Sequence, residues 1–152
     1  MVDGVRVIPL RRFEDERGWF SELMRSSALP KVVRQSNLVF SRKGVIRGLH
    51  YHERGQDDLF ACVSGMVRVV VLDRESGETF SEDIGDENAV AVYVPGRHGH
   101  GYEALTDCLF LYHVTEEYDP DDPDEHEVPW DDPRVRDLWS TRSPILSARD
   151  AS

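Results

Sequence analysis

The sequence has 152 residues, the size of one ordinary domain. Its 18 basic and 29 acidic residues give a formal net charge of −11. This charge excludes general binding to nucleic acid or anionic membrane, because phosphate contacts need a basic surface. Ten of the acids lie in residues 116–132, which leaves 19 acids against 18 bases elsewhere. A basic pocket for a small anionic ligand is therefore compatible with the composition.

Short apolar runs separated by turn residues every 8–12 positions or so predict an all-β sandwich or barrel with little helix. In chain order, the expected strands are residues 5–10, 19–24, 32–39, 59–63, 66–72, 79–84, 90–94 and 109–114. Ser64-Gly65 predicts a hairpin between two of them, and a second turn is expected at residues 74–77.

No run approaches the roughly 20 apolar residues of a transmembrane helix, and the first twelve residues do not resemble a signal peptide. Cys62 and Cys108 each lie in an apolar run and are predicted to be reduced core thiols. We therefore expect a cytoplasmic protein.

The acidic segment 116–132 differs from the rest of the chain. Its three prolines, Pro120, Pro123 and Pro129, exclude a central strand and disfavour a helix. Two interpretations remain open for it. It is either a solvated loop packed on the barrel through Tyr118 and Trp130, or a flap beside a ligand-binding mouth.

Histidines occur in two pairs with the same spacing, His50 with His52 and His98 with His100. In a strand, residues two apart point to one face, so each pair predicts either a metal cage or a polar cavity for acid–base chemistry. A metal cage also needs a carboxylate. Glu53 is expected on the opposite face and Gln56 is a poor ligand, so the pattern leaves the metal interpretation incomplete.

Arg47 precedes His50 by three residues and would lie on the other face of a regular strand. Gly48 lies between them and can permit a β-bulge that re-aims one of the two side chains. A buried arginine at this position would need an anionic partner, either a ligand phosphate or an internal carboxylate.

Several motifs, in order along nearly the whole chain, resemble the dTDP-4-dehydrorhamnose 3,5-epimerases. They include residues 15–22 (DERGWFSE), 35–37 (QSN), 47–51 (RGLHY), 95–96 (PG) with 100–102 (HGY), 130–133 (WDDP) and 146–150 (LSARD). The resemblance implies a cupin jelly-roll β-barrel, with residues 1–152 as a single domain. Residues 1–25 would form an N-terminal arm of strands, in which residues 5–10 pair across a homodimer. Residues 116–152 would cover the barrel as an acidic loop and tail.

The same resemblance implies that the substrate is a dTDP-linked 4-keto-6-deoxysugar, epimerised at C3, C5 or both without a metal or organic cofactor. His50 corresponds to the base, Asp150 to its paired carboxylate and Tyr112 to the acid on the other face of the sugar. On pattern alone, Asp150 near the C-terminus is expected to fray and Tyr112 to be a core residue. The implied substrate contacts are Arg17, Phe20, Glu22, Gln35, Asn37, Arg47, His100, Tyr118 and Trp139.

The chain departs from the family pattern where a lysine normally holds the sugar O4, because Asp58 occupies that position. A carboxylate there would repel a developing oxyanion unless it is protonated or turned away, and Arg68 or Lys43 are candidates to compensate. His52 and His113 also replace usual residues. Three alternatives follow: a metal-dependent cupin using His50 and His52 with His98 or His100, a sugar-nucleotide ketoisomerase, and a non-catalytic binding protein.

Overall fold

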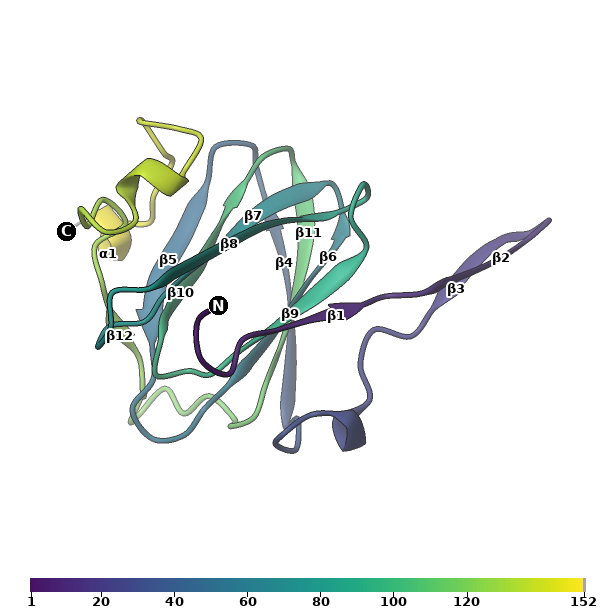
Figure 1. Cartoon of the computed structure of the whole chain (residues 1–152), viewed down its shortest axis with the longest axis horizontal. Coiled ribbons are helices and arrows are strands. Elements are labelled where there is room, and N and C mark those ends of the chain that lie inside the picture. The colour runs from purple at the N-terminus through teal and green to yellow at the C-terminus, as the bar shows by residue number, and fades with distance from the viewer. Residues whose placement is uncertain (152) are drawn as a thin grey trace.

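The computed structural model describes residues 1–151 and contains two five-stranded antiparallel sheets with a two-stranded arm (Figure 1). The first sheet has the order β1 (Arg6–Pro9), β9 (Val90–Val94), β6 (Asp58–Ser64), β11 (Cys108–Val114) and β4 (Gln35–Ser41). The second has the order β12 (His126–Glu127), β5 (Ile46–Tyr51), β10 (Gly99–Ala104), β7 (Met66–Leu72) and β8 (Thr79–Gly85).

Among residues 1–151, helical structure is confined to three short elements, η1 (Ser26–Ala28), η2 (Arg136–Leu138) and α1 (Ala148–Ala151). The prediction of an all-β fold with little helix is thus confirmed. Within residues 1–151, no helix is long and apolar enough to cross a membrane.

The main core lies between the two sheets. Val67, Val69 and Val71 alternate along β7 and face Phe60 of β6 and Phe110 of β11 in one buried cluster. This alternation follows from the two-residue period of a strand, which sends every second side chain inward. Both cysteines are buried free thiols in this core, as predicted.

A second core covers the outer face of the β5–β10–β7 side. The chain after β12 places Val128, Val135 and Trp139 against Leu49 and Val70, the latter on the face of β7 that points away from the main core. Burial on both faces explains the nearly continuous apolar sequence of β7.

The predicted hairpin at Ser64-Gly65 is wrong. β6 pairs with β9 and β11, whereas β7 pairs with β8 and β10, so the chain crosses from one sheet to the other at this point. Gly65 has a φ of 87°, and a Cβ there would lie 2.4 Å from the Asp107 carbonyl oxygen. This close approach, rather than a hairpin turn, accounts for the glycine. The second turn does join a hairpin, since Leu72 pairs with Thr79.

The N-terminal arm divides into two parts. β1 pairs with β9 of its own chain, with Arg6 opposite Tyr93, and lies at the edge of the first sheet, so its other side pairs with no strand of the described chain. β2 (Arg12–Asp15) and β3 (Gly18–Ser21) form a hairpin that projects from the body, at the opposite end of the molecule from α1 (Figure 1).

Candidate active site

A cavity of about 850 Å³ lies between the two sheets. Its walls come from β4, β6 and β11 of one sheet and from β5 and β10 of the other. Residues of the acidic segment, from Glu116 to Glu125, and of the chain from Ile145 to Asp150 complete the lining. Of the two interpretations of the acidic segment, the structure therefore favours a segment beside a cavity.

A bulge in β5 brings Arg47 and His50 to the same cavity. His50 pairs with His100 of β10 and Arg47 pairs with Tyr102, so β5 holds one residue more than its partner between these pairs. Gly48 allows this, because a Cβ on it would lie 2.8 Å from Gly101 Cα. The predicted bulge is confirmed. Arg47 is exposed rather than buried, and its guanidinium donates to Ser41 Oγ at 2.9 Å.

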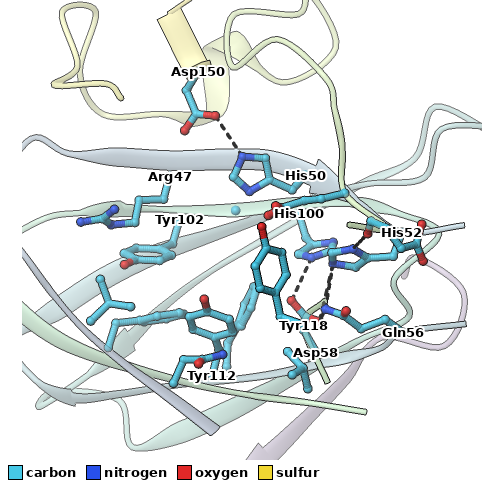
Figure 2. Close-up of a pocket in the computed structure, with 18 of the residues that line it drawn as sticks. Arg47, His50, His52, Gln56, Asp58, His100, Tyr102, Tyr112, Tyr118 and Asp150 are labelled. Carbon is cyan, nitrogen blue, oxygen red and sulfur yellow. Dashed lines mark hydrogen bonds and ion pairs between the residues drawn. The ribbon is translucent and has the colours of Figure 1, made fainter. Parts of the chain in front are cut away.

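His50 and Asp150 form a hydrogen-bonded pair at one wall of the cavity (Figure 2). His50 Nε2 lies 2.9 Å from Asp150 Oδ1, and the Gly48 N–H donates to Asp150 Oδ2 at 3.3 Å. The Asp150 side chain is only 6% exposed. Burial alone would raise the pKa of Asp150, but the contact with His50 outweighs it and lowers this pKa. Asp150 is therefore held in place, contrary to the expectation of fraying.

Tyr112 lies across the cavity from His50, on β11 of the opposite sheet (Figure 2). Burial, followed by the negative charge of Asp58, raises the pKa of its phenol. A tyrosine with a raised pKa keeps its proton at neutral pH and can donate it to a ligand between the sheets. Tyr112 also packs against the main core, as expected from the apolar sequence of β11, so it has both positions.

Asp58 is turned into a group of polar side chains at the same cavity. His100 Nε2 lies 3.1 Å from Asp58 Oδ2, His52 Nε2 lies 3.7 Å from Oδ1, and Gln56 donates to Oδ1 at 2.9 Å. Burial would raise the pKa of Asp58, but His100 and His52 lower it far below its usual range. Burial would likewise lower the pKa of His52, whereas Asp58 raises it.

Neither cation proposed to compensate Asp58 does so. Arg68 pairs with Asp83, its Nε 2.8 Å from Oδ1, and Lys43 lies outside the cavity lining with its backbone N–H bonded to Asp107. The two imidazoles of His52 and His100 take that place.

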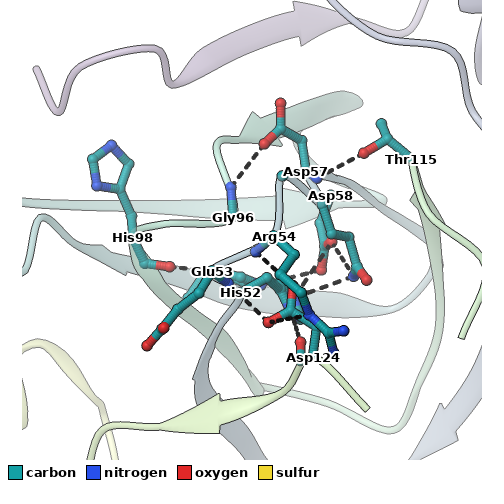
Figure 3. A network of polar contacts seen from close by, with 12 residues as sticks. His52, Glu53, Arg54, Asp57, Asp58, Gly96, His98, Thr115 and Asp124 are labelled. Atoms are coloured by element: carbon teal, nitrogen blue, oxygen red, sulfur yellow. Dashed lines mark hydrogen bonds and ion pairs between the residues drawn. The ribbon is translucent and has the colours of Figure 1, made fainter. Parts of the chain in front are cut away.

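The neighbouring Asp57 has a different function, because it faces away from the cavity (Figure 3). It accepts hydrogen bonds from the Tyr93 hydroxyl at 2.6 Å and from the Gly96 N–H at 2.9 Å. Its own N–H donates to Thr115 Oγ1 at 2.8 Å. Asp57 thus joins β6 and β9 to the turn that leads into β10.

The acidic segment and α1 are tied to each other and to the sheet by ion pairs. Arg149 contacts Glu125, with Nη1 to Oε2 at 3.0 Å, and Glu127. Asp124 accepts the N–H groups of Glu53 and Arg54, at 2.9 and 2.8 Å (Figure 3). These contacts hold Asp150 over His50.

The structure brings together eight of the twelve residues predicted for the site. His50, Tyr112 and Asp150 line the cavity, together with Gln35, Asn37, Arg47, His100 and Tyr118. The other four lie elsewhere. Trp139 is 3% exposed in the second core, with its indole N–H donated to the Trp130 carbonyl, and Arg17, Phe20 and Glu22 lie on or beside the projecting hairpin.

Several polar cavity residues were not among these twelve, including His52, Gln56, Asp58 and Tyr102. The His-x-His spacing did indicate His52, but Asp58 follows a loop, so periodicity could not place its carboxylate beside the two histidines. His98, by contrast, is buried outside the cavity and hydrogen-bonded to the Asp3 carbonyl at 2.8 Å. His113 bonds Ser36 Oγ at 2.7 Å, also outside the cavity.

With this geometry established, comparison with known proteins assigns the chain. The family model described as dTDP-4-dehydrorhamnose 3,5-epimerase matches residues 1–152. The chain belongs to this family. Its resemblance to these epimerases, inferred from the motifs, is confirmed over the full length.

Individual members of the epimerase family agree with the assignment. The spore coat polysaccharide biosynthesis protein SpsL of Bacillus subtilis is 38% identical over 149 residues, covering 93% of this chain and 98% of that protein. The RmlC epimerase of Legionella pneumophila, crystallised with dTDP-4-keto-L-rhamnose, is 27% identical with a TM-score of 0.88, covering 99% of this chain and 86% of that one. The 3'-monoepimerase ChmJ of Streptomyces bikiniensis, crystallised with dTDP-quinovose, is 29% identical with a TM-score of 0.86, covering 97% and 81%. The predicted jelly-roll architecture is that of these epimerases.

Proposed function

We propose that this protein epimerises a dTDP-linked 4-keto-6-deoxyhexose at C3, C5 or both. The single observation that carries the proposal is the His50–Asp150 pair, 2.9 Å from Nε2 to Oδ1, facing Tyr112 across a cavity. Family membership supports it, as do the dTDP-sugar ligands of the Legionella and Streptomyces relatives. Those two relatives differ in whether one or two centres are inverted, so the family alone leaves the regiochemistry open.

The C4 ketone of such a sugar acidifies the protons on C3 and C5. Asp150 accepts a hydrogen bond from the N–H at His50 Nε2, which leaves the lone pair on Nδ1 free to act as the base. When Nδ1 takes the substrate proton, the imidazolium that forms lies beside the Asp150 carboxylate and is stabilised by it. No electrons leave the substrate, so the step requires no redox cofactor.

Inversion then needs a proton from the other face of the enolate. Tyr112 supplies it from the opposite sheet, and its raised pKa keeps the phenol protonated until it is used. The enolate collapses back to the ketone as the new C–H bond forms. A single base without this donor would return the proton to the face it left.

Five further cavity residues are proposed as substrate contacts, with Arg47 as the contact for the nucleotide diphosphate. Arg54 is paired with Asp122 and Asp124, and Arg149 with Glu125 and Glu127. Arg47, in contrast, forms no ion pair with a carboxylate of the described chain. Its guanidinium can therefore take two phosphate oxygens without breaking an ion pair. The other four are Gln35, Asn37, His100 and Tyr118.

We also propose that the protein is a cytoplasmic homodimer in which the β2–β3 hairpin reaches the cavity of a second copy. Phe13, Trp19 and Phe20 are exposed on this hairpin, and Leu38 and Phe40 are exposed on the edge strand β4. Large apolar side chains in such numbers support burial against a partner. In such a dimer, Arg17, Phe20 and Glu22 can contact substrate although they do not line the cavity of their own chain.

The proposal is tested by incubating the protein with dTDP-4-keto-6-deoxyglucose in D₂O and following deuterium at C3 and C5 by NMR. Deuterium at both carbons identifies a double epimerase, and deuterium at one carbon identifies a single epimerase. Binding without deuterium at either carbon contradicts the proposal. The oligomeric state is measured by light scattering, and a monomer would contradict the dimer.

A further inference from the structure

Three buried side chains converge on one point of the cavity lining: His52, Asp58 and His100 (Figure 2). They are 6%, 5% and 3% exposed, and one ligand atom of each lies within 4.8 Å of the other two. His52 directly follows β5, Asp58 begins β6 and His100 lies on β10, so both sheets contribute. Asp58 is thus the carboxylate that the sequence pattern had left unidentified.

The outer nitrogen of each imidazole is fixed by a backbone carbonyl. His52 Nδ1 lies 2.7 Å from the Asp124 oxygen, and His100 Nδ1 lies 2.8 Å from the His98 oxygen. A carbonyl oxygen can only accept, so each Nδ1 must carry a proton. In the neutral ring this places a lone pair on each Nε2, and both Nε2 atoms face Asp58. Metal-binding histidines have this arrangement, in which the second nitrogen donates to a carbonyl or carboxylate.

The two Nε2 atoms and the Asp58 carboxylate are therefore all hydrogen-bond acceptors, and too few donors lie between them. Gln56 Nε2 lies 3.2 Å from His52 Nε2 and 2.9 Å from Asp58 Oδ1. His100 Nε2 and Asp58 Oδ2, 3.1 Å apart, have no such donor among the residues described. Two buried acceptors at this distance need positive charge, supplied either by a proton on the ring or by a cation.

The separations fit a cation bound by all three side chains. Ligand atoms about 2.1 Å from a common ion, at angles of roughly 90–110°, lie roughly 3.0–3.4 Å apart. The distance from His100 Nε2 to Asp58 Oδ2, 3.1 Å, lies within this range, and the distance from His52 Nε2 to Asp58 Oδ1, 3.7 Å, lies slightly above it. A proton on His100 would satisfy its contact with Asp58, and Gln56 already lies between His52 and the other carboxylate oxygen. A divalent ion would instead engage both imidazoles and the carboxylate at once.

We propose that His52, Asp58 and His100 bind a divalent first-row transition-metal ion at the cavity wall. Two imidazoles and one carboxylate suit zinc or iron, and three protein ligands leave coordination positions open for water or an oxygen of the substrate. The site uses none of His50, Tyr112 and Asp150, but it shares His100 with the proposed substrate contacts. His50 and His98, the other histidines considered for a metal cage, are bonded to Asp150 and Asp3 instead.

The test uses untagged full-length protein, stripped with a chelator and titrated with Co²⁺ and with Zn²⁺. We expect one equivalent per chain by elemental analysis, and visible Co²⁺ absorption bands that Zn²⁺ displaces. Asp58→Asn and His52→Gln should each weaken Co²⁺ binding by about 100-fold or more, since each removes a ligand. Thermal unfolding establishes whether each variant is folded. If only one of Asp58→Asn and His52→Gln folds, its Co²⁺ affinity alone is compared with that of the wild type.

His50→Asn is the matched control within the cavity. It should keep the Co²⁺ spectrum and stoichiometry of the wild type while losing deuterium exchange into the sugar. Absence of stoichiometric binding to the folded wild type, or unchanged binding in folded Asp58→Asn, overturns the metal site and assigns the cluster to a protonated imidazole. Failure of the epimerase proposal would appear instead as absent exchange in wild type that still binds metal.

Discussion

Replacing Asp150 with asparagine tests the pair on which the proposed chemistry depends. The substitution preserves the shape of the side chain and an acceptor for Gly48 N–H, but removes the charge 2.9 Å from His50 Nε2. A hydrogen bond to a charged group contributes about 1.5–3 kcal/mol. If this support is gained as the imidazolium forms, its loss lowers kcat by about 10- to 160-fold. An amide that donates to Nε2 would also reverse the tautomer and enlarge the loss.

The assay is the initial rate of deuterium incorporation from D₂O at saturating dTDP-4-keto-6-deoxyglucose. Asp131→Asn, an exposed carboxylate outside the cavity lining, is the control and should exchange at the wild-type rate. Because Asp150 is in the last turn of the described chain, circular dichroism and thermal unfolding should show no change in the sandwich. A folded Asp150→Asn protein with exchange within twofold of wild type would refute the assignment of Asp150 as the support of His50.

Four other outcomes are expected. Tyr112→Phe should reduce formation of the inverted sugar by about 10²-fold or more, while the deuterium exchange that depends on His50 persists. Comparing the rate of product formation with the rate of exchange measures this. An equal loss of product formation and of exchange would argue against a donor role for Tyr112. Because the pKa of Tyr112 is raised, the rate of inversion should not fall through loss of the phenol proton up to about pH 10. The measurement is a pH–rate profile. A fall in rate below about pH 9 that is present in wild type and absent in Tyr112→Phe would contradict this prediction. Arg47→Ala should raise KM for the nucleotide sugar by about 10- to 100-fold with a smaller change in kcat, in steady-state kinetics; an unchanged KM removes it from the diphosphate site. Asp57→Ala leaves the donors Tyr93 Oη and Gly96 N without their acceptor and removes the ion pair with Lys31. It should lower the free energy of unfolding by about 2–5 kcal/mol in urea titration, whereas a loss under about 1 kcal/mol would show that water replaces the carboxylate.

Local sequence signals predicted the features that depend on neighbouring residues. Gly48 indicated the bulge that turns Arg47 and His50 to one cavity, and the bulge is present. Motif matching also identified Asp150, whose pairing with a residue 100 positions earlier has no local signal.

The errors concern contacts between segments distant in sequence. Ser64-Gly65 has the composition of a hairpin turn, but the pairing of β6 and β7 with other strands depends on the whole sheet order. The family resemblance implied a substrate contact at Trp139, yet the chain after β12 folds over the outer face of the second sheet and buries it there. From the sequence, Asp58 looked incompatible with an oxyanion. The contacts of His52 and His100 with its carboxylate could not be predicted, because they form only when both sheets are assembled.

Adjacent aspartates at the start of β6 point in opposite directions. Asp57 braces the turn before β10, and Asp58 faces the cavity, although a sequence reader meets two identical letters. A change at Asp57 is therefore expected to affect mainly the stability of the protein, and through it the amount that persists in the cell. A change at Asp58 is expected to affect mainly the chemistry of the cavity. A substitution at Asp58 can therefore alter the chemistry of the cavity while the hydrogen bonds made by its neighbour stay in place.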